Sequence, residues 1–180
     1  MKTGARQYVK AHVTDIYGKV IVDLETTRPS LSGGIEVEIY GDLYGCFYRG
    51  KVYDRAKLID AIVKSRNESA FLDMLRHSVG NFFVVRRFPD RGYTEVYTSP
   101  GGHGVFYCRT DDAIIVSNLD LPLLQYFCSR RVNQMELLHL IISGGLPSPF
   151  KTLLHDLERM IGGCCLRVTS GMETNLSFYS

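Results

Sequence analysis

The sequence predicts an α+β fold in which antiparallel β-sheets are covered by helices. Apolar residues alternate with polar ones along several short segments, and this spacing changes to helical spacing in two separate blocks. The resulting order is strands, two helices, strands, two helices and strands, and this segregation is typical of α+β domains. With 180 residues and no internal repeat or linker, the chain is expected to form a single domain over residues 1–180.

The first strands are predicted to form a β-hairpin over residues 8–25, with its turn at Tyr17-Gly18. Further strands are expected at 35–40, which alternates, and at 43–48, which is more continuously apolar and suits a buried strand. The alternating residues of the hairpin are Val9, Ala11 and Val13 before the turn, and Val20, Val22 and Leu24 after it.

Four helices are predicted from helical spacing and from capping residues. Asp54 caps the first and Asn67 the second. The third is expected over 120–128, and the fourth over Gln134–Ser143, where Asn133 opens an approximate capping box. The inward-facing residues of the first two helices are Leu58, Ile59, Ile62 and Val63, then Phe71, Leu72 and Leu75. The remaining strands are expected at 81–88, 93–99, 105–109, 113–118, 164–169 and 173–179.

Charge and composition exclude several classes of function. The net charge is +2, with basic and acidic residues interspersed, and the pair Arg86-Arg87 is interpreted as a solvated end of a strand. Binding to nucleic acid or to a membrane is therefore not expected. No apolar run is long enough to span a bilayer, and none follows the charged N-terminus as in a signal peptide. The odd number of cysteines, without an export signal, indicates reduced thiols and a cytoplasmic location.

Two glycine-rich stretches have the composition of phosphate-binding loops but not their context. Residues 143–148 (SGGLPS) resemble the loop of ATP pyrophosphatases, yet they follow an amphipathic helix and carry Pro147 where the aspartate belongs. A glycine C-cap followed by a proline loop is the better interpretation. Residues 100–104 (PGGHG) lead into a strand, which indicates a tight turn with positive φ, and His103 has no evident partner.

The cysteines offer no evident nucleophile or metal site. Cys46, Cys108, Cys128 and Cys164 have the surroundings of small apolar filler residues. Alternation predicts that Cys165 is the most exposed, but no base accompanies it. Because no CxxC or HxxxH spacing occurs either, we assign no catalytic residue, no metal and no cofactor from the residues themselves.

Three stretches of the chain carry motifs of one known family. They are residues 48–58 (YRGKVYDRAKL), residues 80–118 with GNFFVV, TSPGGHGVFY and IVSN, and residues 137–179 with GGLPSP, TL, LERM and LRV. In order and spacing they resemble Tyr-Asn-Gly-Glu-Ile-Tyr-Asn, Gly-x-Phe-Ala-Phe with Arg-Asp-Pro-x-Gly, and the helix–Gly-x-x-Pro…Leu-x-Val ending of the glutaminase domains of asparagine synthetases. The resemblance covers roughly residues 45–180.

This resemblance implies an N-terminal-nucleophile fold, an αββα sandwich of two antiparallel sheets between helix layers. Such class II glutamine amidotransferase domains release ammonia from glutamine with a cysteine directly after the initiator methionine. Here Lys2 occupies that position, Arg49 replaces the oxyanion asparagine while Gly50 remains, and residues 65–71 hold no match for the aspartate that binds the substrate amine. A side-chain oxyanion donor contributes about 3 kcal/mol to transition-state stabilisation. We therefore expect no glutaminase activity.

The resemblance favours a scaffold or partner subunit for a separately encoded ATP pyrophosphatase-type synthetase, because the family's domain packs on such a synthetase. Formation of a homo-oligomer is a second expectation. The docking face is expected on the helix 134–143 and the proline loop after it. The residues assigned to it are Leu137, Leu140, Ile141, Leu146, Pro147 and Phe150.

Two alternatives remain at this stage. In the first, the vacated glutamine pocket binds an anion, and Arg49 and Gly50 are the ligand-binding residues, since a guanidinium is a forked donor for carboxylate or phosphate. In the second, the chain is an amidohydrolase activated by internal cleavage before Cys46 or Cys164. An intact mass would contradict the second alternative.

Overall fold

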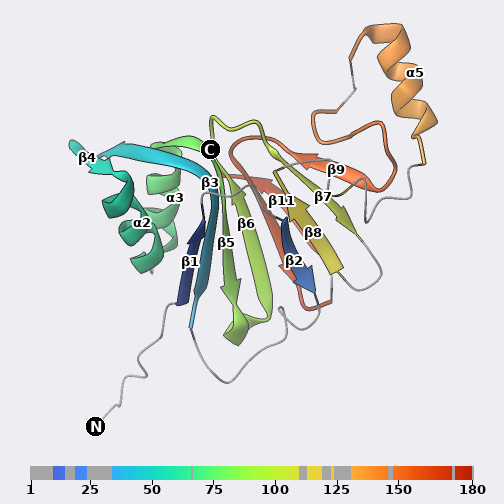
Figure 1. Ribbon diagram of the computed structural model, residues 1–180. Coiled ribbons are helices and arrows are strands. Elements are labelled where there is room, and N and C mark those ends of the chain that lie inside the picture. The colour runs from blue at the N-terminus through green and yellow to red at the C-terminus, as the bar shows by residue number, and fades with distance from the viewer. Residues whose placement is uncertain are drawn as a thin grey trace.

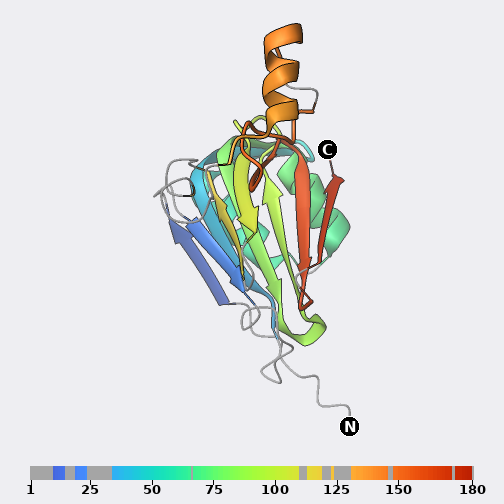
Figure 2. The ribbon, with the colours of Figure 1, turned by 90° about the vertical axis from the view of Figure 1, so that its right-hand side faces the viewer.

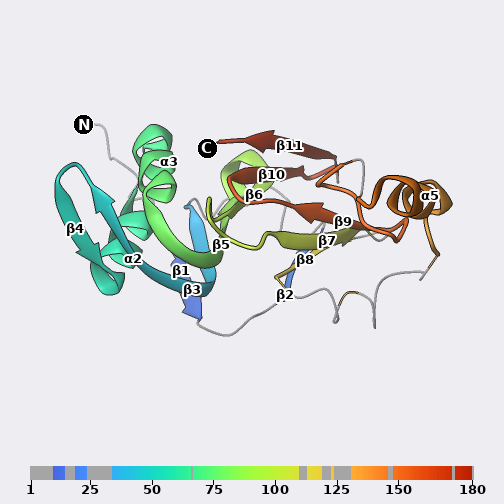
Figure 3. The same ribbon diagram turned by 90° about the horizontal axis from the view of Figure 1, so that it is seen from above.

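The structure of the chain, a computed structural model, has an α+β architecture of two stacked sheets with helices, as predicted (Figure 1). It describes residues 10–14, 19–23, 34–65, 67–109, 113–118, 123, 131–145, 148–171 and 173–179. Viewed from above, α2 and α3 lie on one side of the larger sheet and the smaller sheet lies on the other (Figure 3). No helix in these described ranges has the length and apolar character needed to cross a bilayer.

The larger sheet is antiparallel except at one edge, where β1 runs parallel to β3. In the described ranges it has seven strands, and β4 pairs with β3 off the main path. The order along that path is β1 (Lys10–Thr14), β3 (Glu36–Tyr48), β5 (Ser78–Phe88), β6 (Tyr93–Thr98), β10 (Cys164–Thr169) and β11 (Thr174–Phe178), with β4 at Lys51–Asp54.

The smaller sheet is antiparallel throughout, and its strands overturn the predicted hairpin. Its order is β2 (Lys19–Asp23), β8 (Ala113–Ser117), β7 (Val105–Arg109) and β9 (Leu157–Met160). Because β1 pairs with β3 while β2 pairs with β8, the two strands predicted as one hairpin belong to different sheets. Alternation identifies a strand with one covered face, but it carries no information about the strand's partner. Val9, Tyr17, Gly18 and Leu24 lie outside the described residues.

Strand β3 is a single long strand where two were predicted. A register shift between Leu43 and Gly45 marks an irregularity within it. Gly41 has φ of 93°, and a Cβ atom there would lie 2.4 Å from the carbonyl oxygen of Asn81 on β5. Glycine at this position therefore lets the backbones of β3 and β5 approach each other and keeps the two segments in one strand.

Helices α2 (Arg55–Lys64) and α3 (Glu68–Arg76) confirm the predicted faces and caps. The Asp54 carboxylate accepts from the Lys57 amide, and the Asn67 side chain accepts from the Ala70 amide. Their apolar faces meet the larger sheet in one core. Its fully buried helical residues are Leu58, Ile62, Phe71 and Leu75.

Strand β5 is covered on both faces, which explains its continuous apolar run. Phe82 and Val84 belong to the core under the helices, whereas Phe83 and Val85 belong to the core between the two sheets. On the outer face of the smaller sheet, a third cluster surrounds Leu123, which is helical and fully buried. Leu123 falls in the helix predicted over 120–128, and the rest of that helix lies outside the described residues.

Helix α5 (Gln134–Ser143) has the predicted bounds and projects from the body of the domain (Figures 1 and 2). The Asn133 side chain accepts from the Glu136 amide, and Gly144 ends the helix with φ of 71°. The loop after it is therefore a glycine C-cap, as expected. A short 3₁₀ turn, η1 (Pro89–Arg91), joins β5 to β6.

The central position of Phe83 generates a stability prediction. Its ring is fully buried and stacks on Tyr40 with centroids 4.9 Å apart. Phe83→Ala should lower the free energy of unfolding by about 3–5 kcal/mol through lost burial and a cavity. The matched control is Tyr44→Ala, an exposed aromatic on the same sheet, with a change of at most about 0.5 kcal/mol. Urea denaturation measures both, and equal losses would contradict the assigned core.

Candidate functional site

Arg49 and Gly50 lie together on the exposed turn between β3 and β4. Both have positive φ, 50° and 73°, and the Arg49 guanidinium lies 5.0 Å from the ring centroid of the neighbouring Tyr48. Neither residue lines any of the three cavities described below. The turn also lies on the opposite side of the molecule from α5 (Figures 1 and 3). The two sequence-predicted sites are therefore separate.

The described cysteines are all buried, which includes Cys165, predicted to be the most exposed. That prediction is wrong because a core covers each face of β10. Cys164 belongs to the core between the sheets and Cys165 to the core under the helices, so alternation along the strand does not expose Cys165. Burial raises the pKa of the Cys46 and Cys164 thiols. Burial and the nearby Glu95 carboxylate raise the pKa of Cys165 to about 12. Cys128 lies outside the described residues.

Because a thiolate is the reactive form, these cysteines should resist alkylation in the native state. Iodoacetamide at pH 8 should leave Cys46, Cys108, Cys164 and Cys165 unmodified, while the same treatment in urea labels all four. Peptide mass spectrometry of the two samples checks the outcome. Rapid native labelling of Cys46 would instead support the cleavage-activated hydrolase.

Within the described ranges no group of three or more His, Cys, Asp or Glu residues is arranged to hold a metal ion. In the glycine-rich turn 100–104, Gly104 has φ of 87°, and a Cβ atom there would lie 2.3 Å from the Met160 carbonyl oxygen. His103 is exposed, and its amide donates to the Asn81 side chain at 3.2 Å. The stretch is thus a tight turn, as predicted.

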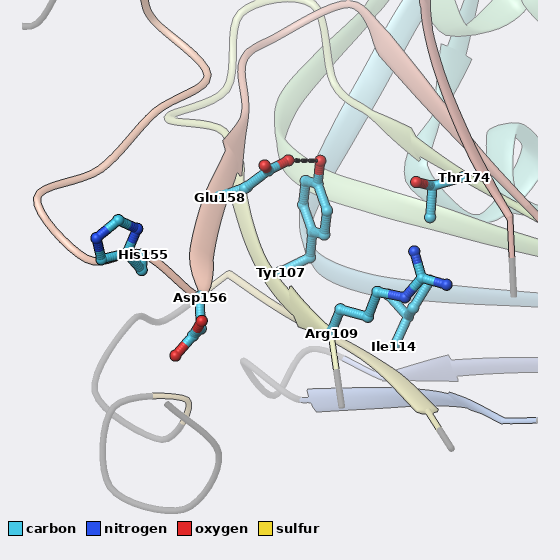
Figure 4. Close-up of a pocket in the computed structure, with 7 residues that line it drawn as sticks. All are labelled: Tyr107, Arg109, Ile114, His155, Asp156, Glu158 and Thr174. Atoms are coloured by element: carbon cyan, nitrogen blue, oxygen red, sulfur yellow. Dashed lines mark hydrogen bonds between the residues drawn. The ribbon is translucent and has the colours of Figure 1, made fainter. Parts of the chain in front are cut away.

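A cavity of about 520 Å³ is lined by residues of β7, β8 and β9 of the smaller sheet and by Thr174 of β11 in the larger sheet (Figure 4). At its centre the Tyr107 hydroxyl donates to Glu158, and Lys151 Nζ lies 2.7 Å from the other oxygen of that carboxylate. No pattern in the sequence identifies this cluster, because Tyr107 and Glu158 are about fifty residues apart and meet only when β7 pairs with β9. The lining residues are Tyr107, Arg109, Ile114, His155, Asp156, Glu158 and Thr174.

The carboxylate in this cavity is held as an anion. Burial favours its neutral form, but the hydrogen bonds from Lys151 and Tyr107 and the Lys151 charge outweigh it and lower the pKa of Glu158. Burial and the same carboxylate raise the pKa of Tyr107. A carboxylate with two partners and a lowered pKa is a poor general acid or base at neutral pH.

Glu158 generates a prediction on acid stability. The pKa of Glu158 in the folded state lies below its ordinary value of 4.5. The stability that the ionised carboxylate contributes is therefore fully present above pH 4.5 and is lost as the pH falls through the folded-state pKa. Glu158→Gln should therefore flatten the decline in unfolding free energy between about pH 5 and pH 3. Glu173→Gln, at an exposed carboxylate, is the control and should leave the decline unchanged. Urea titrations at each pH measure it.

A second buried polar cluster lies on the helix-facing side of β6 and β10. Glu95 is buried, and Arg167 donates to it from Nε and Nη2 at 2.9 and 2.5 Å. The Tyr97 hydroxyl donates to the other oxygen of Glu95 at 2.5 Å. Burial is the main reason that the pKa of Tyr97 is raised, and Cys165 and Glu95 add to it. All acceptors of this cluster are in use.

A group of exposed apolar residues lies on and beside α5, and we call it the α5 surface. Ile141 is 71% exposed and Ile142 76% exposed, and no residue of the helix is buried. Its members are Val132, Met135, Leu137, Leu138, Ile141 and Ile142. Of the residues assigned to the docking face, Leu137 and Ile141 are exposed, whereas Leu140 is half-buried. The sequence assignment did not include Val132, Met135, Leu138 and Ile142.

The remaining residues assigned to the docking face lie elsewhere. Leu146 and Pro147 fall outside the described residues. Phe150 is half-buried against the core between the sheets, with its ring 5.7 Å from that of Phe178. Only part of this ring is therefore available to a docking face, which the sequence alone does not reveal, because an aromatic residue after a proline loop looks the same whether it faces inward or outward.

The base of α5 is fixed to the body by backbone contacts. The Asn133 amide donates to the Leu153 carbonyl at 2.9 Å, and the His155 amide donates to the Arg131 carbonyl at 3.0 Å. A cavity of about 530 Å³ lies at this base, lined by residues 131–135 and His155. The helix is thus presented in a defined direction.

No protein-family model matches the sequence, and no curated protein matches it. Among solved structures, the chain is similar to an allosteric regulatory enzyme of purine biosynthesis, with 11% identity over 85% of this chain and a TM-score of 0.46. It is also similar to glutamine phosphoribosylpyrophosphate amidotransferase from B. subtilis in complex with ADP and GMP, with 12% identity over 89% of this chain and a TM-score of 0.42. The chain spans 30% and 31% of those two chains. Both TM-scores are below 0.5, so the fold and the candidate site are assigned from the strands, helices and side chains of this chain and not from these two similarities.

Proposed function

We propose that this chain is a non-catalytic, glutaminase-like partner subunit that docks through α5 on a separately encoded ATP-dependent synthetase of the asparagine synthetase type. The observation that carries the proposal is the projecting, apolar α5 with no buried residue. The motif resemblance supplies the partner, because in that family the glutaminase domain packs on such a synthetase domain. Arg49, which replaces the oxyanion asparagine of the family's motif, supports the loss of glutaminase chemistry.

A helix of this length needs packing to be stable. Isolated helices shorter than roughly 12–15 residues are marginal in water, and most helical stability in proteins comes from burying an apolar face. Helix α5 has 10 residues, none of them is buried, and Leu140 is the one apolar residue of the helix that is half-buried. A partner that covers α5 would supply the missing stabilisation, and that need supports a docking role.

The apolar residues of α5 form one broad face. Leu137, Leu138, Ile141 and Ile142 are spaced i, i+1, i+4 and i+5, so they lie within about 140° of the helix circumference. The polar side chains of Glu136, His139 and Ser143 lie on the other side of the helix. An amphipathic helix of this kind can lay its apolar face into an apolar groove on another protein, and we assign that groove to the synthetase.

The proposal predicts that the synthetase is lost when α5 is made polar. Tagged protein is used to capture partners from the native host, and the recovered synthetase is quantified by mass spectrometry. Burial of one such side chain contributes about 1.5–3 kcal/mol, so the double variant Ile141→Asp with Ile142→Asp should weaken binding by roughly 100-fold or more. Val52→Asp, at an exposed apolar residue on β4, is the matched control and should bind normally.

Three outcomes would contradict the proposal. The wild type recovers no ATP pyrophosphatase-type synthetase, or the α5 variant recovers as much as the wild type, or the purified chain forms a homodimer that only the α5 variant abolishes. The last outcome would make the surface a self-association interface. Equal melting temperatures of the three proteins show that the substitutions act on binding and not on folding.

A further inference from the structure

A third cavity, of about 170 Å³, lies where the start of β3, the start of α3 and the turn between β5 and β6 meet. It lies near the opposite end of β3 from the turn that carries Arg49, and it shares no lining residue with the other two cavities. Its described lining residues are Gly34, Ile35, Glu68, Arg86, Phe88, Asp90, Arg91 and Tyr93.

The wall of this cavity contains a buried arginine. Arg86 is only 2% exposed, which overturns the interpretation of Arg86-Arg87 as a solvated strand end. Its guanidinium carbon lies 4.1 Å from the ring centroid of Phe71 and 5.0 Å from that of Phe88. These two aromatic contacts fix the plane of the guanidinium and offset part of its desolvation.

One hydrogen-bond donor of Arg86 is unused among the described residues. Its Nε has no hydrogen-bond partner, and the structure forms no ion pair between Arg86 and any described carboxylate. Glu95 is its register partner on β6, but that carboxylate is already held by Arg167 and Tyr97. Arg87, the next residue, pairs with Glu38 at 2.8 Å. Among these strand arginines, Arg86 is the one that faces a cavity.

A buried cation without a counter-ion is costly, and an anion that enters the cavity would offset that cost. A second guanidinium, Arg91, is exposed at the cavity and donates to the Tyr93 hydroxyl at 3.3 Å. Two carboxylates, Glu68 and Asp90, line the same space. They oppose a multiply charged anion such as phosphate, but they would attract the ammonium group of a zwitterion.

We propose that this cavity binds a small carboxylate, held by Arg86 with Arg91 beside it, and that Glu68 and Asp90 select ligands which also carry an ammonium group. The fork of a guanidinium matches the two oxygens of a carboxylate. Since one water occupies about 30 Å³ of liquid, a space of this size accepts a ligand of roughly five or six heavy atoms. This binding site is independent of the docking role of α5.

The test measures binding of propionate, β-alanine and propylamine to the full chain by thermal unfolding and calorimetry at constant ionic strength. Both carboxylates should raise the melting temperature, by roughly 5 °C at a concentration of 100 times Kd, and propylamine should have no effect. β-Alanine should bind more tightly than propionate. Inorganic phosphate should bind more weakly than either carboxylate.

The variants separate the ligand site from general effects. Arg86→Met should abolish the carboxylate effect, and if that variant fails to fold, Arg91→Gln at the exposed arginine still tests the site by raising Kd about tenfold. Asp90→Asn should remove the advantage of β-alanine over propionate. Arg109→Gln, an exposed arginine at another cavity, is the control and should bind both as the wild type does. Absence of any carboxylate effect, or an effect that survives Arg86→Met and Arg91→Gln, would overturn the proposal.

Discussion

Burial of both faces of the central strands is the constraint on which the rest of this domain depends. Strand β5 supplies Phe82 and Val84 to the core under α2 and α3, and Phe83 and Val85 to the core between the sheets. A polar group in such a strand has no access to bulk water, so it needs a partner within the fold. Glu95 obeys this rule through Arg167 and Tyr97. The unused Nε of Arg86 is a departure from it, and that is why the cavity beside it is a candidate ligand site.

The sequence predicted the local elements well because their signals are local. The caps Asp54, Asn67 and Asn133 bond within their own helices, so a short window contains all the information needed. Strand pairing is not a local signal, because β1 pairs with β3 and β2 pairs with β8, and neither partner is the next strand in the chain. The short strand β9 carries charged Glu158 and Arg159 and therefore gave no strand pattern. Pairing with β7 forms this strand despite its composition.

The candidate sites were less predictable, for a physical reason. An apolar helix has the same sequence pattern whether its own domain or another protein covers it. The sequence therefore suggested a docking face on α5 but could not establish that this helix projects from the domain. The prediction that Arg86 and Arg87 are solvated is wrong, because the two side chains point to opposite faces of β5 and both faces of that strand are covered. Only the packing of Phe71 and Phe88 around the guanidinium reveals that Arg86 is buried.

The exposed apolar helix α5 and the buried Arg86 lie in different parts of the molecule. The turn between β5 and β6 is at the foot of the larger sheet, whereas α5 stands above its top (Figure 1). Coupling between such sites requires an element with two arrangements that both sites bias. The strands between them are packed on both faces, and closely packed cores resist graded deformation. Ligand binding at Arg86 and partner binding at α5 are therefore expected to be energetically independent, so each can be removed by substitution without loss of the other.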